Sequence, residues 1–149
     1  MSVHTANINW QRHPHSSDSN TYSRNHLVKL NGDQQINVSA SKEFKGDPNC
    51  ADPEQMLLSA VSSCHMLFFL AVADFKGFSV ESYDDNPEGY LEKNAKGGME
   101  ITRITLNPKV IFSDDNQPDS DTITQIHAKA HKSCFIRNSI TASVEVNHF

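Results

Sequence analysis

The sequence predicts an α+β fold in which one long helix lies among several strands. Three observations support this prediction: a nearly continuous apolar stretch from Met56 to Phe75, strand-like segments on both sides of it, and a shorter amphipathic stretch closer to the C-terminus. The resulting order is strands, long helix, strands, helix, strand, without a glycine-rich dinucleotide or phosphate loop. This order favours an α+β protein over a nucleotide-binding fold.

The long helix has recognisable start and stop signals. Asp52 is a natural N-cap, Pro53 fits the first helical position, and Gln55 can complete a capping box. Lys76-Gly77 supplies the stop. About 24 residues at a rise of 1.5 Å per residue give a helix of roughly 36 Å. Because it is apolar nearly all round, we expect a central element that is covered on several sides.

Strands are predicted before this helix. Residues 3–10 alternate loosely between apolar and polar side chains. Segments 26–30 and 35–41 flank Asn31-Gly32, which is a strong short-range signal for a β-hairpin.

Further strands and a second helix are predicted after the long helix. Turns at Asn86-Pro87 and Gly97-Gly98 separate the three strand-like segments, which are 79–85, 89–94 and 99–112. Residues 121–133 have the spacing of an amphipathic helix, and residues 139–149 alternate like a half-buried strand.

Composition limits the domain organisation and the class of partner. A chain of 149 residues is expected to form one domain over 1–149, and its hydrophobic fraction of 37% suggests that an oligomer completes the burial. The net charge of -5 and the absence of a basic run argue against nucleic acid as a partner. The opening residues, MSVHTANINW, do not have the pattern of a signal peptide, so we expect a cytoplasmic protein whose three cysteines are reduced.

The long apolar stretch raises the question of a membrane span. Residues 56–75 are long enough to cross a bilayer. Polar residues interrupt the stretch, however, and strand-like segments flank it on both sides. We therefore expect a buried helix of a soluble protein, and no membrane partner.

Two of the cysteines are candidates for chemistry. Cys64 lies near the middle of the long helix, and Cys134 ends the second helix. Buried cysteines usually act as small hydrophobic residues, and this interpretation suits Cys50 in its polar loop. Cys64 and Cys134 each lie beside polar neighbours, and the strand-rich sequence between them allows the fold to bring them together.

A metal site is a competing interpretation of the same region. His127, His131 and Cys134 have a spacing that places two rings one turn apart, and Cys64 with His65 could add ligands. The chain has no paired CxxC motif, and two histidines four residues apart on an amphipathic helix are usually surface or core residues. We therefore expect neither a metal nor another cofactor.

The residues around the two cysteines resemble a known family. The segments DPEQMLLSAVSSCHMLFFLAVADFKGFSVESYDD and AHKSCFIRNSI are similar to the OsmC/Ohr family of thiol-dependent hydroperoxide reductases. The family pattern has a proline-glutamate pair, a cysteine ten residues after that glutamate, a second cysteine near the last helix and an arginine about thirty residues before the glutamate. Here these positions are Pro53-Glu54, Cys64, Cys134 and Arg24, and the assignment of Arg24 depends on loop spacing.

The resemblance implies an OsmC-like fold, a homodimer and a reaction. Antiparallel strands of two intertwined chains would wrap a pair of central helices, with the active sites at the dimer interface. Cys64 would reduce an organic hydroperoxide to an alcohol and become a sulfenic acid, and Cys134 would then form a disulfide with it. An external dithiol reductant, lipoyl-type or thioredoxin-type, would restore both thiols. The branch with strong organic-peroxide activity usually has a proline after the second cysteine, where this chain has Phe135.

Arg24 and Glu54 are the expected auxiliary residues. A buried thiol becomes a thiolate only beside a positive charge, which Arg24 can supply, and Glu54 can hold the guanidinium by a bidentate pair. Glu54 and Cys64 are roughly 15 Å apart along one helix, so a carboxylate acting at the sulfur must come from a partner chain or act through Arg24. Taken singly, Arg24 is better explained as an exposed strand-end charge and Glu54 as a first-turn residue that favours the helix dipole. As a set at the family's spacing, the two are better explained as residues of the site.

Residues 66–69, an apolar run after the cysteine, would suit organic hydroperoxides but are equally explained as core, and His65 is expected to be a hydrogen-bonded core histidine.

Two rival functions stay open. One is a redox-sensing or small-molecule-binding module with slow thiol chemistry, and the other is a metal-binding or purely structural dimer.

Overall fold

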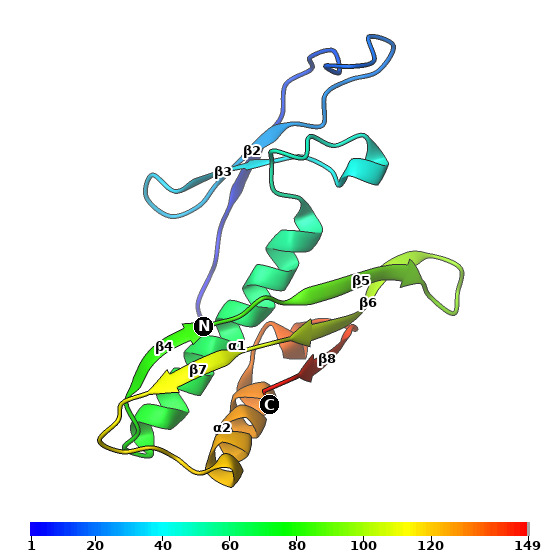
Figure 1. Cartoon of the computed structure of the whole chain (residues 1–149). Coiled ribbons are helices and arrows are strands. Elements are labelled where there is room, and N and C mark those ends of the chain that lie inside the picture. The colour runs from blue at the N-terminus through cyan, green and yellow to red at the C-terminus, as the bar shows by residue number, and fades with distance from the viewer. Residues whose placement is uncertain (149) are drawn as a thin grey trace. The chain divides into compact units, whose positions relative to one another are not determined.

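The computed structural model describes residues 1–148 (Figure 1). The chain forms two compact units, Met1–Met56 and Leu57–Phe149, which are described here one at a time. The expectation of one domain over residues 1–149 stays a prediction.

The N-terminal unit is a small antiparallel sheet with loops. The Asn31-Gly32 hairpin is confirmed, and Gly32 adopts a φ of 60° in the turn, a conformation that glycine accepts without steric cost. The sheet has the order β1-β2-β3, and a 3-10 helix follows it. The elements are β1 Asn7–Asn9, β2 His26–Lys29, β3 Gln35–Val38 and the 3-10 helix η1 Lys42–Phe44.

Helix α1 has the capped ends that the sequence predicts. It spans Pro53–Phe75, so its first turn belongs to the N-terminal unit and the rest to the C-terminal unit. The capping box is confirmed: the Gln55 N–H donates to Asp52 Oδ1 at 2.8 Å, and the Asp52 N–H donates to Gln55 Oε1 at 3.1 Å. Gly77 ends the helix with a φ of 81°.

Apart from β8, the strands of the C-terminal unit form a long antiparallel ribbon that is interrupted once (Figure 1). Its two halves are a two-stranded sheet, β4-β7, and a three-stranded sheet, β5-β6-β8. The strands are β4 Val80–Asp84, β5 Glu88–Lys93, β6 Met99–Leu106, β7 Lys109–Phe112 and β8 Ser143–Val146.

The interruption lies where prolines remove backbone donors. Residues 99–112, read as one strand-like segment from the sequence, split into β6 and β7 around Pro108, which has no N–H to give to a ladder. Asp85 bridges the break by accepting the Asn107 N–H at 2.7 Å, and its other oxygen accepts the hydroxyl of Ser62 on α1. One carboxylate thus fixes the bend of the ribbon against the helix.

The last strand departs from the expected antiparallel arrangement. β8 pairs with β6 in parallel, from Arg103 opposite Ser143 to Leu106 opposite Val146. Helix α2 (Ser120–Ser133) and the 3-10 helix η2 (Arg137–Ser139) lie between β7 and β8. Parallel neighbours need such a crossover connection, so α2 is the reason for the change of direction.

Two apolar clusters hold the C-terminal unit together. The first joins α1, α2 and β7, and its buried members are Phe69, Val72, Ala73, Phe112, Ile126 and Ala130. The second joins α1 to β6 and β8, and its buried members are Val61, Ile104, Leu106 and Val144. By length and composition alone α1 could cross a membrane, but these clusters show that it is the shared core helix of the unit.

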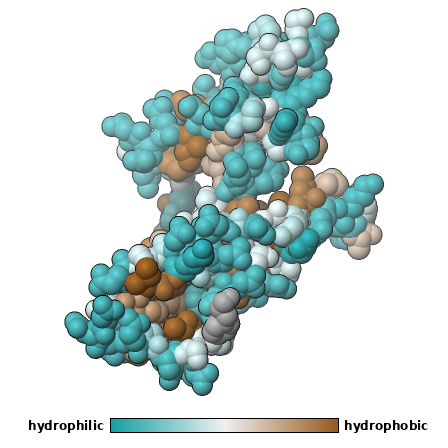
Figure 2. Space-filling model, viewed as in Figure 1, coloured by the Kyte–Doolittle hydropathy of each residue, from teal (hydrophilic) through white to brown (hydrophobic). Residues whose placement is uncertain are grey.

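The surface is mostly hydrophilic, with scattered apolar groups (Figure 2). Two large apolar side chains of α1 are exposed, Leu67 at 62% and Phe75 at 85%. Exposed apolar side chains that occur singly are common on folded proteins.

Candidate thiol redox site

Helices α1 and α2 bring Cys64 and Cys134 together. Cys64 is half-buried near the middle of α1, and Cys134 is the buried C-cap of α2, with 1% of its surface exposed. Cys64 acts on the pKa of Cys134 through a hydrogen bond between the two side chains, so the sulfurs are neighbours. Cys134 Sγ also lies 3.9 Å from the Val61 carbonyl oxygen on α1. Both thiols are free.

The surroundings of Cys134 disfavour its thiolate. Burial raises the pKa of Cys134 to about 11, although the Arg137 backbone N–H donates to its sulfur at 3.4 Å and opposes that rise. The neighbouring Cys64 raises the pKa further. A thiol in this state is a poor initial nucleophile but is well placed to react with a modified sulfur beside it.

A pair of buried histidines lies next to the sulfurs. His65 follows Cys64 on α1, and its Nε2 is hydrogen-bonded to Nδ1 of His127 on α2 at 3.0 Å, with the two rings stacked at an interplanar angle of 11°. The expectation of a hydrogen-bonded core histidine at position 65 is confirmed. Its partner could not be identified from the sequence, because residues 65 and 127 meet only in the folded chain.

Both histidines are neutral at neutral pH. Burial lowers the pKa of His65 to about 4 and that of His127 to about 3, and neighbouring histidines lower both values further. The pair therefore gives no positive charge to a thiolate at Cys64. A cation that stabilises that thiolate has to be a different group.

The metal interpretation finds no support in the described part of the chain. Within residues 1–148 no group of three or more His, Cys, Asp or Glu residues is arranged to hold a metal ion. His131 lies edge-on to His65, with ring centroids 6.5 Å apart, and so contributes to the histidine cluster.

Arg24 lies in the N-terminal unit, where Tyr22 holds it. Its guanidinium lies 4.3 Å from the centre of the Tyr22 ring and donates to the Tyr22 carbonyl and, at 3.1 Å, to the Thr21 hydroxyl. Arg12 lies over the same ring at 6.0 Å. These contacts of the Arg24 guanidinium use Nη1 and the face of the Tyr22 ring, so further N–H donors remain.

Glu54 has an unsatisfied carboxylate oxygen. Its Oε2 is buried and has no hydrogen-bond partner among the described residues, and none of the ion pairs there joins it to Arg24. The expected bidentate pair between Glu54 and Arg24 is therefore not present within this single chain. A buried unpaired carboxylate is costly, so this oxygen indicates a missing donor.

The apolar run after Cys64 divides into different roles. Phe69 is fully buried core, whereas Leu67 is exposed. Phe68 packs edge-to-face against Phe135, the residue after Cys134, with ring centroids 4.9 Å apart. Phe135 therefore adds an aromatic side chain at the end of α2.

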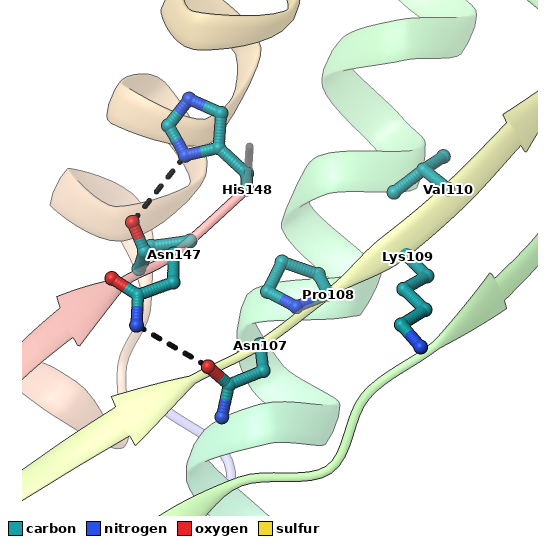
Figure 3. A pocket seen from close by; sticks show the side chains of 7 residues that line it. Asn107, Pro108, Lys109, Val110, Asn147 and His148 are labelled. Atoms are coloured by element: carbon teal, nitrogen blue, oxygen red, sulfur yellow. Dashed lines mark hydrogen bonds between the residues drawn. The ribbon is translucent and has the colours of Figure 1, made fainter.

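Two pockets of the C-terminal unit are lined by residues other than the two helical cysteines. Figure 3 shows a pocket of about 700 Å³ where the β6–β7 bend meets the end of β8; in it Asn147 donates to Asn107 Oδ1 at 3.3 Å. A second pocket of about 500 Å³ adjoins α2 and is lined in part by His127, His131 and His148. Neither lining includes Cys64 or Cys134.

Comparison with known proteins identifies the fold. An OsmC-like protein of unknown function from Vibrio cholerae is 37% identical over the whole length of both chains, with a TM-score of 0.93. The organic hydroperoxide resistance protein OhrB of Bacillus subtilis is 17% identical, with a TM-score of 0.67 over 97% of this chain and 98% of the other. The latter likeness shows the fold alone.

Sequence comparison gives the same result. The uncharacterized protein YmaD of Bacillus subtilis (strain 168) is 28% identical over 110 residues, which cover 73% of each chain. The family model described as OsmC-like protein matches residues 46–149, and this range contains Glu54 and both helical cysteines. The chain belongs to the OsmC-like protein family.

Proposed function

We propose that this protein is a two-cysteine thiol peroxidase that reduces organic hydroperoxides to alcohols. The observation that carries the proposal is the contact between the Cys64 and Cys134 side chains, one half-exposed and one buried, across the α1–α2 seam. A reactive sulfur that substrate can reach and a protected sulfur beside it are the two parts that such a cycle needs. The organic hydroperoxide resistance proteins among the structures of the same fold agree with this chemistry.

The proposed cycle balances in three steps. The Cys64 thiolate attacks the peroxide oxygen that bears the hydrogen, and the O–O bond breaks. Cys64 becomes a sulfenic acid, and the alkoxide that departs takes up a proton to give the alcohol. The Cys134 thiol then displaces that hydroxyl as water and forms the disulfide. An external dithiol, lipoyl-type or thioredoxin-type, reduces the disulfide and is itself oxidised to a disulfide. We place the protein in the cytoplasm, where such reductants operate.

Arg24 and Glu54 complete the site in this proposal. The thiolate needs a cation, and the buried histidine pair is neutral. The Arg24 guanidinium has donors left beyond its contacts with Tyr22 and Thr21, while Glu54 Oε2 needs a donor. In a homodimer, Glu54 of one copy would pair with an Arg24 that faces Cys64 of the other copy, which is compatible with the roughly 15 Å that separate Glu54 from Cys64 along one helix.

A rival function has one observation in its favour. The raised pKa of Cys134 and the neutral histidines give a site in which thiol exchange is slow unless Arg24 reaches it. Slow thiol exchange would be sufficient for a redox-sensing or small-molecule-binding dimer.

Stopped-flow oxidation of the reduced protein separates the two functions. Fast loss of thiol titre with cumene hydroperoxide, slower loss with hydrogen peroxide, and neither in Cys64→Ser are expected for the peroxidase. Sluggish, stoichiometric oxidation by both peroxides would favour the sensor instead.

A further inference from the structure

The seam between α1 and α2 contains two side-chain contacts of different chemistry. Cys64 meets Cys134 at the end of α2, and His65 meets His127 two turns earlier on α2. The hydrophobic effect that drives the apolar contacts of this seam is non-directional and selects a register only through the shapes of the side chains. The hydrogen bond between the two rings, at 3.0 Å and between buried residues, does select one.

We propose that the His65–His127 hydrogen bond is a positioning element that holds Cys134 in disulfide-forming geometry against Cys64. A disulfide needs two sulfurs about 2 Å apart and a narrow range of distances between the Cα atoms, so a small slide of α2 along α1 separates the thiols. His127 lies seven residues before Cys134 on the same helix, and α2 transmits its position as a rigid rod. The biological meaning of this inference rests on the proposed function. The positioning of the two sulfurs, however, can be tested without any peroxide.

Three further observations support a lasting bond rather than a fluctuating one. Each ring is almost completely buried, at 1% for His65 and 2% for His127. The low pKa values keep both rings neutral, so one nitrogen can donate and the other accept at any pH near neutral. Phe69 and His148 also pack against the His127 ring, with centroids 4.4 Å and 4.5 Å away.

Matched substitutions isolate the hydrogen bond from the volume of the ring. His65→Phe keeps an aromatic ring and removes the bond, whereas His65→Gln keeps an amide nitrogen or oxygen close to the position of Nε2. At the partner, His127→Phe and His127→Asn form the corresponding pair for Nδ1. Ile126→Val controls for destabilisation, because Ile126 is fully buried on α2 and takes no part in the bond.

The test is the equilibrium between the Cys64–Cys134 disulfide and glutathione. Protein dithiol and oxidised glutathione give protein disulfide and two reduced glutathione molecules, and the balance measures the effective concentration of one thiol for the other. We expect at least a tenfold fall in His65→Phe and His127→Phe, near-normal values in His65→Gln and His127→Asn, and no fall in Ile126→Val. The double Phe variant should be no worse than either single one, since the same bond is lost.

Other results would overturn the inference. Unchanged effective concentrations in both Phe variants, or a fall in Ile126→Val as large as theirs, mean that the bond does not position the sulfurs. Should the Phe variants fail to fold, the wild type still decides by NMR: a slowly exchanging ring N–H coupled to a nitrogen of the other ring is expected, and its absence contradicts the proposal. Because no peroxide is used, slow peroxidase activity with a normal glutathione equilibrium would count against the proposed function alone.

Discussion

The two compact units of this chain differ in what they bury and in the chemistry they carry. Among the described residues of the N-terminal unit the buried ones are Val28, Val38 and Ser39, whereas the C-terminal unit has two apolar clusters. The C-terminal unit holds both sulfurs and the neutral histidines, and the N-terminal unit holds Arg24. In the proposed function the two units would have different roles: the C-terminal unit carries the thiols, and the N-terminal unit carries the arginine that is proposed to act on them.

The largest expected effect is at Cys64, the sulfur of the C-terminal unit that is proposed to react with peroxide. Cys64→Ser should abolish the fast loss of thiol titre with cumene hydroperoxide, because no other thiol of the chain is both accessible and paired with a second sulfur. The measurement is stopped-flow oxidation with single turnover of the reduced protein. Cys50→Ser is the matched control and should react at the wild-type rate; a Cys64→Ser protein that still reacts fast places the chemistry at another cysteine.

The next effect is on stability, and it compares a buried with an exposed aromatic residue of α1. Phe69→Ala should reduce the free energy of unfolding by about 3–5 kcal/mol, because it empties space in the cluster that joins α1 to α2. Phe75→Ala, at a side chain that is 85% exposed, should change the stability of the monomer by about 0.5 kcal/mol or less. Urea denaturation of both variants checks this, and equal losses would contradict the assignment of the core.

The charge attributed to the N-terminal unit is tested at Arg24. Arg24→Ala should slow the first oxidation by about 10²-fold, as expected for the loss of one preorganised charge at a reacting centre. Arg24→Lys should recover part of the rate, because lysine keeps the charge but not the bidentate geometry.

Arg12→Ala is the control for this substitution, since Arg12 also lies over the Tyr22 ring. It should leave the rate unchanged. Equal slowing in Arg12→Ala and Arg24→Ala would mean that the surface around Tyr22, rather than the guanidinium at the sulfur, is responsible.

The last effect concerns pH and the neutral histidines. The folded chain lowers the pKa of His65 and His127 from 6.5 to about 4 and about 3, so the unfolded chain takes up protons first. The stability they contribute is complete above about pH 6.5 and is lost as the pH falls toward 4, by up to about 1.4 kcal/mol per pH unit for each ring. Urea denaturation at pH 7 and pH 5 should show this loss, and His65→Phe should show roughly half of it. A pH-independent wild type would contradict the buried neutral pair.

Local signals explain why the elements could be predicted. Asp52 and Gln55 form the capping box, Gly77 ends α1, and Asn31-Gly32 makes the hairpin turn, each through residues close in sequence. The family pattern located the cysteines. These features depend on a few neighbouring residues, so the sequence is sufficient to find them.

Contacts between distant residues could not be predicted. The parallel pairing of β8 with β6 follows from the crossover through α2, and the His65–His127 bond joins residues 62 positions apart. In the sequence, the spacing of His127 and His131 fits a metal motif and does not indicate the contact with His65. The partner of Glu54 could not be predicted either, because Glu54 Oε2 has no hydrogen-bond donor among the described residues of one chain.

The central claim is that Cys64 and Cys134 of one chain form the disulfide of the reaction. Mass-spectrometric mapping after one equivalent of cumene hydroperoxide tests it most directly. The account predicts a peptide pair that links Cys64 to Cys134 within a chain, with Cys50 still a free thiol. A disulfide that contains Cys50, or a Cys64 sulfenic acid that persists beside an unreacted Cys134, would contradict it.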